Sequence, residues 1–455
     1  MSLAQNKRIS IIYVSIRIVL IAMAAIVWYF FQIVIPQSNI IPPIQVILVV
    51  IYIFLLCAFC SVFDCFAVGQ ARIRELSAWY CLALFFANLL MWIVMFAVVH
   101  PPVSFLTLIF AWFVQSVLGM LLMIFFNRRY YKVYPKRHIC AIIAGTDYEV
   151  QTLAKIAAIS ERFAIEEVHN QKDVDWDSIE TIAPECNTIL IGSVNPPFRQ
   201  IIVDSCFKKS RMTIVLPTPT NVIFSGYRPT QISDSLLYVQ SNIGLSPEQR
   251  FCKRVIDIIG ALIGIVLSAI PMGICAIIIK ATDKGPVFYR QSRLTRDGRV
   301  FSLLKLRSMC VDAEKDGARF TTGADDRITA VGRFMRPTRL DETPQFFNVL
   351  KGDMSLVGPR SERLETSEAY TAADPAFAYR LKVKTGMTGY AQINGRYNTG
   401  YEDKLRMDLY YIEHWSLLGD ISLMLETFKI LFSSNSTAGF DTDSIESLIH
   451  SPTKF

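Results

Sequence analysis

Two adjacent carboxylates, Asp341 and Glu342, are the residues of this 455-residue chain best placed to do chemistry. Three of the eight residues before Asp341 are arginines: Arg333, Arg336 and Arg339. Thr343-Pro344, directly after the pair, is typical of a helix start, with threonine at the N-cap and proline at the first helical position. The positive end of such a helix would favour the ionised form of both carboxylates. An ionised carboxylate among arginines suits attack on an anionic phosphate ester, and a capped surface helix with a few ion pairs is the alternative explanation.

The composition is that of a membrane protein. Hydrophobic residues make up 52% of the chain and charged residues only 19%, and the mean hydropathy is +0.35; an ordinary soluble enzyme is less apolar. Four segments without Lys, Arg, Asp or Glu are each long enough to cross a hydrocarbon core of about 30 Å. They lie at residues 18–35, 44–63, 78–99 and 103–126. We therefore predict a four-helix transmembrane domain over residues 1–137.

Basic residues predict the orientation of these helices. The basic flanks are Lys7, Arg8, Arg72, Arg74 and the run 127–137. The loops at 36–43 and 100–102 contain no Lys or Arg. The positive-inside rule then places the N-terminus and everything after residue 127 in the cytoplasm. The net charge of +7 suits an anionic bilayer surface or anionic substrates, and no basic stripe interleaved with aromatic residues indicates nucleic acid.

The ten cysteines form no pattern typical of a disulfide framework or a zinc site. Cys57 and Cys60 lie inside the second apolar segment without His or Cys partners at ligand spacing, and the others are scattered. We interpret them as reduced, small apolar residues of a cytoplasm-facing protein.

Residues 138–245 alternate between short apolar runs and polar helical stretches, which predicts a Rossmann-like cytoplasmic α/β domain with a largely parallel sheet. The predicted strands are 139–144, 163–168, 188–191, 212–216 and 236–239, and the predicted helices are 149–158 and 198–208. Dinucleotide-binding domains carry Gly-x-Gly-x-x-Gly after the first strand, but here Gly145 is the only glycine of that turn. Close approach to a pyrophosphate is therefore not predicted. A structural, regulatory or oligomerising module is expected.

A fifth apolar segment, 255–279, contains only one charged residue, Asp257. Read as a transmembrane span, it would move residues 280–455 outside the cell. Basic residues flank both of its ends: Lys253, Arg254, Lys280 and Lys284. Pro271 breaks the middle of the helix, and Ser268 is placed to satisfy a freed backbone group. We therefore predict a re-entrant helix that bends near Ser268 and Pro271 and leaves on its side of entry.

Glycine-rich turns that end near arginine follow in order within about a hundred residues. The glycine-containing motifs are Gly285-Pro-Val-Phe-Tyr-Arg-Gln, Gly352-Asp-Met-Ser-Leu-Val-Gly-Pro-Arg and Thr385-Gly-Met-Thr-Gly-Tyr-Ala-Gln-Ile-Asn-Gly-Arg. The basic motif Lys305-Leu-Arg-Ser-Met lies after the first of them. Backbone amides and arginine side chains are common means of holding phosphates. From about Lys253 to Phe432 these motifs resemble the bacterial polyprenyl-phosphate sugar-1-phosphate transferases, also called monotopic phosphoglycosyl transferases.

The resemblance implies a function and a mechanism. A hexose-1-phosphate, glucose or galactose by subfamily, would pass from a UDP-sugar to undecaprenyl phosphate with release of UMP. Asp341 would be the nucleophile that carries the phospho-sugar, and Glu342 its partner carboxylate. The family implies a Mg²⁺ ion that bridges Asp341 and the diphosphate, where it would offset charge repulsion. The residues matching basic phosphate- or nucleotide-binding positions are Lys305, Arg307, Arg336 and Arg360.

The sequence departs from the family pattern at several positions. Ala269 and Ile270 separate Ser268 from Pro271, which are commonly adjacent, so the apex of the re-entrant helix is not fixed by the motif. Thr343 replaces the usual leucine after the dyad. None of these changes removes a predicted catalytic group.

The expected organisation is thus a transmembrane domain (1–137), a Rossmann-like domain (138–245), an α-rich catalytic domain (246–433) and a polar tail (434–455). We expect a multi-pass protein of the bacterial inner membrane with its catalytic domain on the cytoplasmic face. It would act in exopolysaccharide or capsule synthesis. The sequence leaves the oligomeric state open and is compatible with a homodimer. Two alternatives remain. One is a polytopic transferase that joins sugar phosphate and lipid in one direct step; the other is a non-catalytic membrane scaffold or nucleotide sensor.

Overall fold

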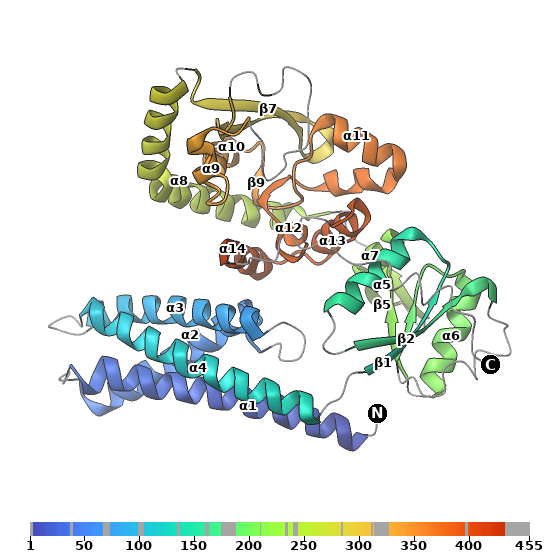
Figure 1. Ribbon diagram of the computed structural model, residues 1–455, viewed down its shortest axis with the longest axis horizontal. Helices are drawn as coiled ribbons and strands as arrows, with labels where there is room; N and C mark the ends of the chain where they lie inside the picture. The colour runs from blue at the N-terminus through green and yellow to red at the C-terminus, as the bar shows by residue number, and fades with distance from the viewer. Residues whose placement is uncertain are drawn as a thin grey trace. The chain divides into compact units, whose positions relative to one another are not determined.

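The computed structural model describes most of the chain (Figure 1). The described residues are 3–36, 40–66, 73–98, 104–133, 137–159, 163–173, 188–209, 211–232, 235–239, 244–283, 285–310, 313, 327–395 and 399–432. The chain divides into two compact units, residues 1–217 with 438–455 and residues 218–437. The predicted polar tail and Lys284 lie outside the described residues.

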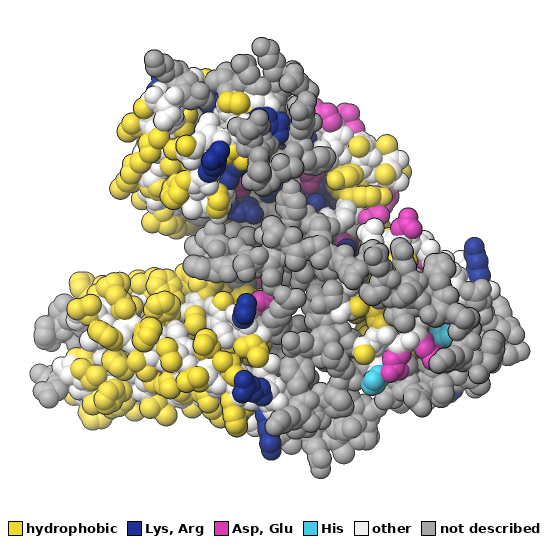
Figure 2. Space-filling model, in the orientation of Figure 1, with side chains coloured by type: hydrophobic (Ala, Val, Ile, Leu, Met, Phe, Trp, Pro, Cys, Tyr) yellow, Lys and Arg dark blue, Asp and Glu magenta, His cyan; other side chains and the backbone are white. Residues whose placement is uncertain are grey.

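The first unit begins with long apolar helices. They are α1 (Leu3–Tyr29), which continues as a π-helical turn over Phe30–Val34, α2 (Pro42–Val62), α3 (Ile73–Val98) and α4 (Phe105–Val133). These four and α8 (Pro247–Asp283) of the second unit are long and apolar enough to cross a membrane. Figure 2 shows apolar side chains over the visible face of α1 to α4. Large exposed side chains such as Ile26 and Phe54 (69% and 71% exposed) suit contact with lipid better than with water.

One buried glutamine joins the four N-terminal helices. Gln115 of α4 donates to the Ala24 carbonyl of α1 and to the Tyr52 hydroxyl of α2, at 2.8 Å each. It accepts a hydrogen bond of 2.7 Å from Asn88 of α3. Between apolar helices, where dispersion contacts with lipid and protein are similar, such hydrogen bonds help to specify which helices associate.

The α/β region of the first unit contains a four-stranded parallel sheet of order β2-β1-β3-β4. Its elements are β1 (Arg137–Ile143), α5 (Asp147–Ile159), β2 (Phe163–Asn170), the 3₁₀ turn Gln171–Asp173, β3 (Thr188–Ile191), α6 (Pro196–Lys208) and β4 (Met212–Val215). Alternate β1 residues pack on opposite faces: Ile139 and Ala141 against Leu153 of α5, and Ile142 against Phe198 of α6. The predicted parallel α/β sheet is confirmed, with a helix on each face.

The turn after β1 holds a carboxylate where a dinucleotide fold would hold a phosphate. Glu149 is buried, and its side chain accepts hydrogen bonds from the backbone amides of Ala144 and Thr146 and from Ser193 after β3. These amides are therefore already engaged by a negative charge, which would also repel a phosphate. The structure gives a physical reason, beyond the missing glycines, why this turn is poorly suited to a pyrophosphate.

The prediction for 236–239 was wrong in one respect. This segment does not extend the parallel sheet, because β6 (Ser235–Val239) pairs antiparallel with β5 (Arg228–Ile232). Both strands lie beyond the division at residue 217, in the second unit. The preceding helix, α7 (Pro219–Ser225), places Val222 in a core with Phe377 and Leu405, so this segment packs with the catalytic region.

The second unit is rich in short helices, as predicted for the catalytic region. After α8 its elements are β7 (Phe288–Leu294), the 3₁₀ turn η4 (Arg296–Gly298), β8 (Val300–Leu306), α9 (Ala330–Met335), the 3₁₀ turn η5 (Leu340–Glu342), α10 (Gln345–Lys351), β9 (Ser355–Val357), α11 (Leu364–Ala373), the 3₁₀ helix η6 (Pro375–Lys382), β10 (Gly386–Thr388), α12 (Tyr390–Asn394), α13 (Tyr401–Glu413) and α14 (Leu417–Phe432). β7 and β8 form an antiparallel hairpin, and β9 pairs parallel with β10.

Buried polar groups fix the first half of α8 against this unit. Lys253 forms an ion pair of 2.6 Å with Asp420 of α14, and the Asp420 carboxylate also accepts a hydrogen bond of 2.8 Å from Tyr411 of α13. One turn on, Asp257 accepts hydrogen bonds from Ser355 Oγ and from the Leu356 amide of β9. The single acidic residue of the fifth apolar segment is thus buried together with hydrogen-bond donors, as a buried carboxylate requires.

α8 bends sharply within its 37 residues (Figure 1). At 1.5 Å per residue a straight helix of this length would reach roughly 55 Å, well beyond a hydrocarbon core. Pro271 lies inside the helix, and the Ser268 hydroxyl donates a 2.6 Å hydrogen bond to the Gly264 carbonyl. Proline and such back-bonding of a serine to the fourth preceding carbonyl both bend helices.

Candidate active site

Asp341 and Glu342 lie in η5, a short 3₁₀ turn between α9 and α10. Arg339 enters this turn in the left-handed conformation (φ 54°), which a non-glycine residue adopts rarely and at a cost. The predicted capping by Thr343 was wrong, since α10 begins at Gln345 and the Thr343 hydroxyl donates back to the Leu340 carbonyl at 2.8 Å. The dyad is therefore held by a tight turn and not by the N-cap of a helix.

Three cations from separate segments surround Glu342. Lys305 Nζ lies 3.0 Å from Glu342 Oε1, Arg339 Nη1 lies 3.3 Å from Oε2, and Arg360 Nη2 lies 3.8 Å from Oε1. Lys305 comes from β8, Arg339 from the entry to η5, and Arg360 from the segment after β9. The Glu342 side chain is 17% exposed, so solvent screens these ion pairs only in part. Glu342 thus connects three parts of the site.

Asp341 is in a different situation although it is the next residue in the chain. It is buried at 9% exposure. Within the described residues, no lysine or arginine nitrogen lies within 4.0 Å of its carboxylate, although Lys305 and Arg336 lie near enough to act on it electrostatically. The carboxylate also accepts a hydrogen bond from the Asp341 backbone amide, and its remaining acceptor positions are available for a ligand or a reacting phosphorus.

The two carboxylates differ in acidity. Burial, followed by repulsion from Glu342, raises the pKa of Asp341 to about 6, against the opposing attraction of Lys305 and Arg336. Burial also opposes ionisation of Glu342, but Lys305, Arg360 and Arg339 outweigh it and lower the pKa of Glu342 to about 2. The expectation that a helix end favours the ionised form of both groups was wrong for Asp341, because burial and Glu342 disfavour that form. For Glu342 the ionised form is favoured, but by side-chain cations.

The other predicted basic residues occupy two kinds of position. Arg336, after α9, donates from Nε to Ser308 Oγ at 3.1 Å and, like Lys305, favours the ionised form of Asp341. Arg307, at the end of β8, is buried and lies directly against Gly285, where a β-carbon would collide with its guanidinium. The predicted role of Arg307 in phosphate binding stays a prediction.

The two later glycine motifs, 352–360 and 385–396, contact each other next to Arg360. The Gly358 amide donates to the Thr388 carbonyl and the Gly386 amide to the Pro359 carbonyl, both at 2.9 Å. A β-carbon on Gly386 would collide with the backbone of Gly358, so these glycines are needed for close approach. The resulting backbone contact positions the Arg360 segment beside the dyad.

Two positioning groups were missed from the sequence. Arg339 stood within the quoted run but was not assigned a site role; the structure shows that it forms an ion pair with Glu342 and has a left-handed backbone. Arg293 of β7 donates to the Ser361 carbonyl at 2.8 Å, and burial together with repulsion from Arg360 lowers its pKa to about 10. No spacing in the sequence indicates Arg293, because it comes from a strand some 50 residues before the dyad.

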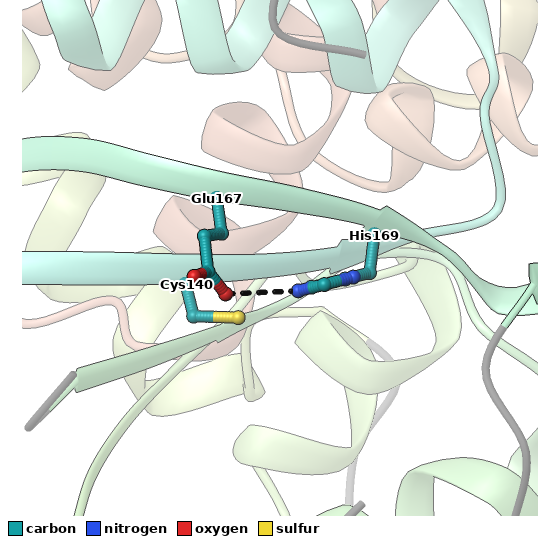
Figure 3. Close-up of side chains that lie close together, drawn as sticks. All are labelled: Cys140, Glu167 and His169. Atoms are coloured by element: carbon teal, nitrogen blue, oxygen red, sulfur yellow. Dashed lines mark hydrogen bonds and ion pairs between the residues drawn. The ribbon is translucent and has the colours of Figure 1, made fainter. Parts of the chain in front are cut away.

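A separate group of possible metal ligands lies in the parallel sheet of the first unit (Figure 3). Cys140 of β1 and Glu167 and His169 of β2 place one ligand atom each within 4.8 Å of one another. A register shift between Ile139 and Cys140 sets Cys140 opposite Glu167, on the same face as His169. Glu167 is half exposed and already forms a 3.1 Å hydrogen bond with His169. Cysteine spacing could not reveal this group, because two of its members come from another strand.

Comparison with known proteins places the match on the second unit. The sequence profile of the family described as bacterial sugar transferase matches residues 248–434. A UDP-N-acetylgalactosamine-undecaprenyl-phosphate N-acetylgalactosaminephosphotransferase of Aeromonas hydrophila is 40% identical over 191 residues, which cover 41% of this chain and 45% of that protein. A UDP-glucose:undecaprenyl-phosphate glucose-1-phosphate transferase of Klebsiella pneumoniae is 44% identical over 184 residues, 39% of either chain.

A protein of Caulobacter vibrioides with the same name as the Klebsiella transferase is 39% identical over 189 residues. This match covers 40% of the present chain and 70% of the Caulobacter protein. With the Aeromonas and Klebsiella proteins, the chain spans less than half of the relative's length. The family profile covers the part of the chain that carries the dyad and its cations.

Proposed function

Because this chain belongs to the bacterial sugar transferase family, we propose that it transfers a hexose-1-phosphate from a UDP-sugar to undecaprenyl phosphate. The observation that carries the proposal is the contrast within the dyad. Among the described residues, no cation contacts the buried Asp341, whose pKa is raised to about 6, whereas three cations contact Glu342. A nucleophile needs accessible, weakly solvated oxygens, and a positioning group needs fixed partners.

In the proposed first step an Asp341 oxygen attacks the β-phosphorus of the UDP-sugar. A bond forms between Asp341 Oδ and phosphorus, the bond from that phosphorus to the bridging oxygen breaks, and UMP leaves with the bonding electrons. In the second step a phosphate oxygen of undecaprenyl phosphate attacks the same phosphorus and the bond to Asp341 breaks. The carboxylate is restored and the product is undecaprenyl-diphospho-hexose. Two sequential displacements let two bulky substrates use one site in turn.

The cations have distinct proposed roles. Lys305 and Arg360 lie on the Glu342 side of the dyad and are set to hold the phosphates of the donor as charge moves onto UMP. Arg336 acts on Asp341 and would neutralise the charge between that carboxylate and the approaching phosphate. Glu342 keeps Lys305, Arg339 and Arg360 in position.

The donor set also fits the Mg²⁺ ion that the family implies. Magnesium prefers oxygen ligands and is commonly held by one or two carboxylates together with substrate phosphates. Asp341 offers carboxylate oxygens that no described cation contacts, while those of Glu342 are taken by ion pairs. We propose that Asp341 and the diphosphate hold the ion, which would offset the repulsion between carboxylate and phosphate.

The covalent route predicts UMP release before the acceptor binds. Purified protein incubated with a UDP-hexose labelled in the sugar and without undecaprenyl phosphate should release about one UMP per active site and retain the label. Adding undecaprenyl phosphate should then move the label into lipid. UMP formation that requires the acceptor from the start would contradict the covalent intermediate, and absence of label from lipid under all conditions would favour a scaffold.

The raised pKa of Asp341 predicts an acid limb in the pH profile. Only the ionised carboxylate attacks, so kcat/KM for UMP release should rise with pH, with a midpoint near the pKa of about 6. An unperturbed aspartate would give a midpoint near 4. A profile that is flat between pH 5 and 8 would show that Asp341 ionisation does not limit the reaction.

We propose that α8 is re-entrant and that the catalytic region therefore lies on the cytoplasmic face of the inner membrane; Pro271 inside α8 and the Ser268 hydrogen bond to the Gly264 carbonyl support a bend there. Two native cysteines test this directly: Cys252 is exposed before the apolar run and Cys310 is exposed after it. Both should react with a membrane-impermeant maleimide in inverted vesicles, and neither should react in intact spheroplasts. The single variants Cys252→Ser and Cys310→Ser identify which site is labelled. Labelling of Cys310 from the outer face would mean that α8 spans the membrane.

The sugar is proposed to be glucose or galactose. The relatives named above act, by their names, on glucose and on N-acetylgalactosamine, so a panel of UDP-sugars in the UMP-release assay decides the matter. A kcat/KM for UDP-N-acetylgalactosamine above those for both hexoses would replace the proposed sugar without affecting the proposed chemistry.

A further inference from the structure

A second group of cations surrounds a cavity of about 270 Å³ at the turn between β7 and β8. The cavity is lined by Thr295, Arg296, Asp297, Arg299, Gly352 and Lys384. Arg254 of α8 reaches the same place, because a β-carbon built on Gly352 would stand 3.5 Å from Arg254 Nη2 and 3.6 Å from Lys384 Nζ. Four cations from three segments therefore converge on one small cavity.

This cavity is distinct from the dyad. β8 begins at Val300, directly after Arg299 of the cavity, and ends at Leu306, directly after Lys305, which pairs with Glu342. At about 3.3 Å per residue, Arg299 and Lys305 are roughly 20 Å apart along the strand. The proposed reaction uses none of the residues that line the cavity.

The positive charge at the cavity exceeds the nearby negative charge. Arg296 pairs with Asp297 at 3.1 Å, and Arg299 lies 3.6 Å from Asp353. Asp353 is shared, because Lys351 also pairs with it at 2.9 Å. These pairs involve exposed arginines, so they neutralise little of the potential inside the cavity.

Arg254 and Lys384 have no carboxylate within 4.0 Å among the described residues. Arg254 instead donates to the Val349 and Leu350 carbonyls at the end of α10, at 2.6 Å each. Burial, followed by repulsion from Arg254 and then from Arg296 and Arg299, lowers the pKa of Lys384, against attraction from Asp257. A half-buried ammonium that is repelled by three cations would be stabilised by a bound anion.

The backbone keeps the cavity open. Gly352 ends α10 with φ 92°, a conformation that disfavours any side chain, and so the cavity has no side chain between Arg254 and Lys384. Its volume is below the roughly 300–1,000 Å³ of pockets for drug-sized ligands. A phosphate group with part of its ester substituent fits these limits better than a whole nucleotide sugar.

We propose that this cavity binds a phosphate group, and that a phospholipid headgroup supplies it. Arg254 directly precedes the apolar run of α8, whose large side chains are exposed, as at Ile259 and Leu262. The cavity therefore lies where an apolar membrane-facing helix begins, which is the level of lipid phosphates. A bound headgroup would fix the β7–β8 hairpin, and with it Lys305, relative to the bilayer.

Acylation of Lys384 in the purified full-length protein, read by mass spectrometry, tests the proposal without any turnover. The reagent reacts with the neutral amine, and the probes are dihexanoylphosphatidylglycerol, dihexanoylphosphatidylcholine and inorganic phosphate. A bound anion that raises the pKa of Lys384 by one unit slows acylation about tenfold. Lys208 of α6, an exposed lysine of the first unit, serves as the internal control and should keep its rate.

The double variant Arg296→Gln, Arg299→Gln is the matched control. Arg296 lies in the turn η4 and Arg299 directly follows it. A thermal unfolding measurement verifies the fold of the variant. Protection of Lys384 by phosphatidylglycerol alone, lost in the variant, supports a lipid headgroup site. Equal protection by inorganic phosphate supports the site but assigns it to soluble phosphate. No protection by any probe, or protection retained in the variant, would overturn the proposal. Equal protection by phosphatidylcholine, which also carries a phosphate, would support the headgroup site without a preference for anionic lipid. None of these outcomes depends on whether the proposed transfer reaction is correct.

Discussion

Asp341→Asn is expected to lose activity and gain thermal stability at the same time. The amide retains the shape of the side chain but cannot act as the nucleophile, so UMP release should fall by at least about 10⁴-fold, as for other enzymes without their nucleophile. The ionised carboxylate is disfavoured in the folded protein, since burial and Glu342 raise the pKa of Asp341 to about 6. A shift of about two units corresponds to roughly 3 kcal/mol at neutral pH.

The sign of the stability effect follows from the two protonation states. Between about pH 4 and pH 6 the folded protein holds a proton that the unfolded chain has lost, so the wild-type protein becomes less stable as the pH rises through this window. Above about pH 6 Asp341 is ionised in both states, and the full loss of stability from its raised pKa is present. Asp341→Asn should therefore unfold at a higher temperature than the wild type at pH 7.5, and the difference should shrink toward pH 4.

The control for this variant is Asp204→Asn on α6, which removes an exposed carboxylate of the same type. It should change neither UMP release nor the unfolding temperature by a measurable amount. An active Asp341→Asn protein would remove Asp341 from the role of nucleophile. An inactive but destabilised protein would instead show that the Asp341 carboxylate is satisfied in the folded state.

Glu342→Gln is expected to weaken the site in a different way. The substitution leaves Lys305, Arg339 and Arg360 without their carboxylate, so the unfolding free energy at pH 7 should fall by roughly 3 kcal/mol, from the lowering of the Glu342 pKa to about 2. Glu342 contributes this stability above its unfolded pKa of about 4.3, and the contribution is lost as the pH falls toward 2. The difference between variant and wild type should thus be largest at neutral pH and decrease in acid.

The same substitution should change the pH profile as well as the rate. Without repulsion from Glu342, and with Lys305 and Arg336 still present, the pKa of Asp341 should fall, which moves the acid limb of kcat/KM below pH 6. Displaced cations should lower kcat by on the order of 100-fold. The matched control is Glu368→Gln, an exposed residue of α11. An acid limb that stays at pH 6 in Glu342→Gln would show that another group titrates there.

Much of the architecture could be predicted from the sequence, because it depends on local patterns. Uninterrupted apolar runs identify the long helices, and alternation between short apolar and polar stretches predicts the parallel sheet. The prediction for 236–239 failed because a short apolar run does not reveal its partner strand, which here is the adjacent β5 in antiparallel pairing. The helix start at Thr343 failed because a tight turn at Arg339 competes with the local capping preference.

The sequence by itself determined the order of motifs, the adjacency of Asp341 and Glu342, and the resemblance that assigns them a reaction. It could not determine that two neighbouring carboxylates have opposite properties. That difference depends on which cations approach which oxygen, and Lys305 and Arg360 reach Glu342 from positions 37 residues before it and 18 residues after it. Electrostatic energy depends on distance and burial in space, and only the tertiary structure sets both.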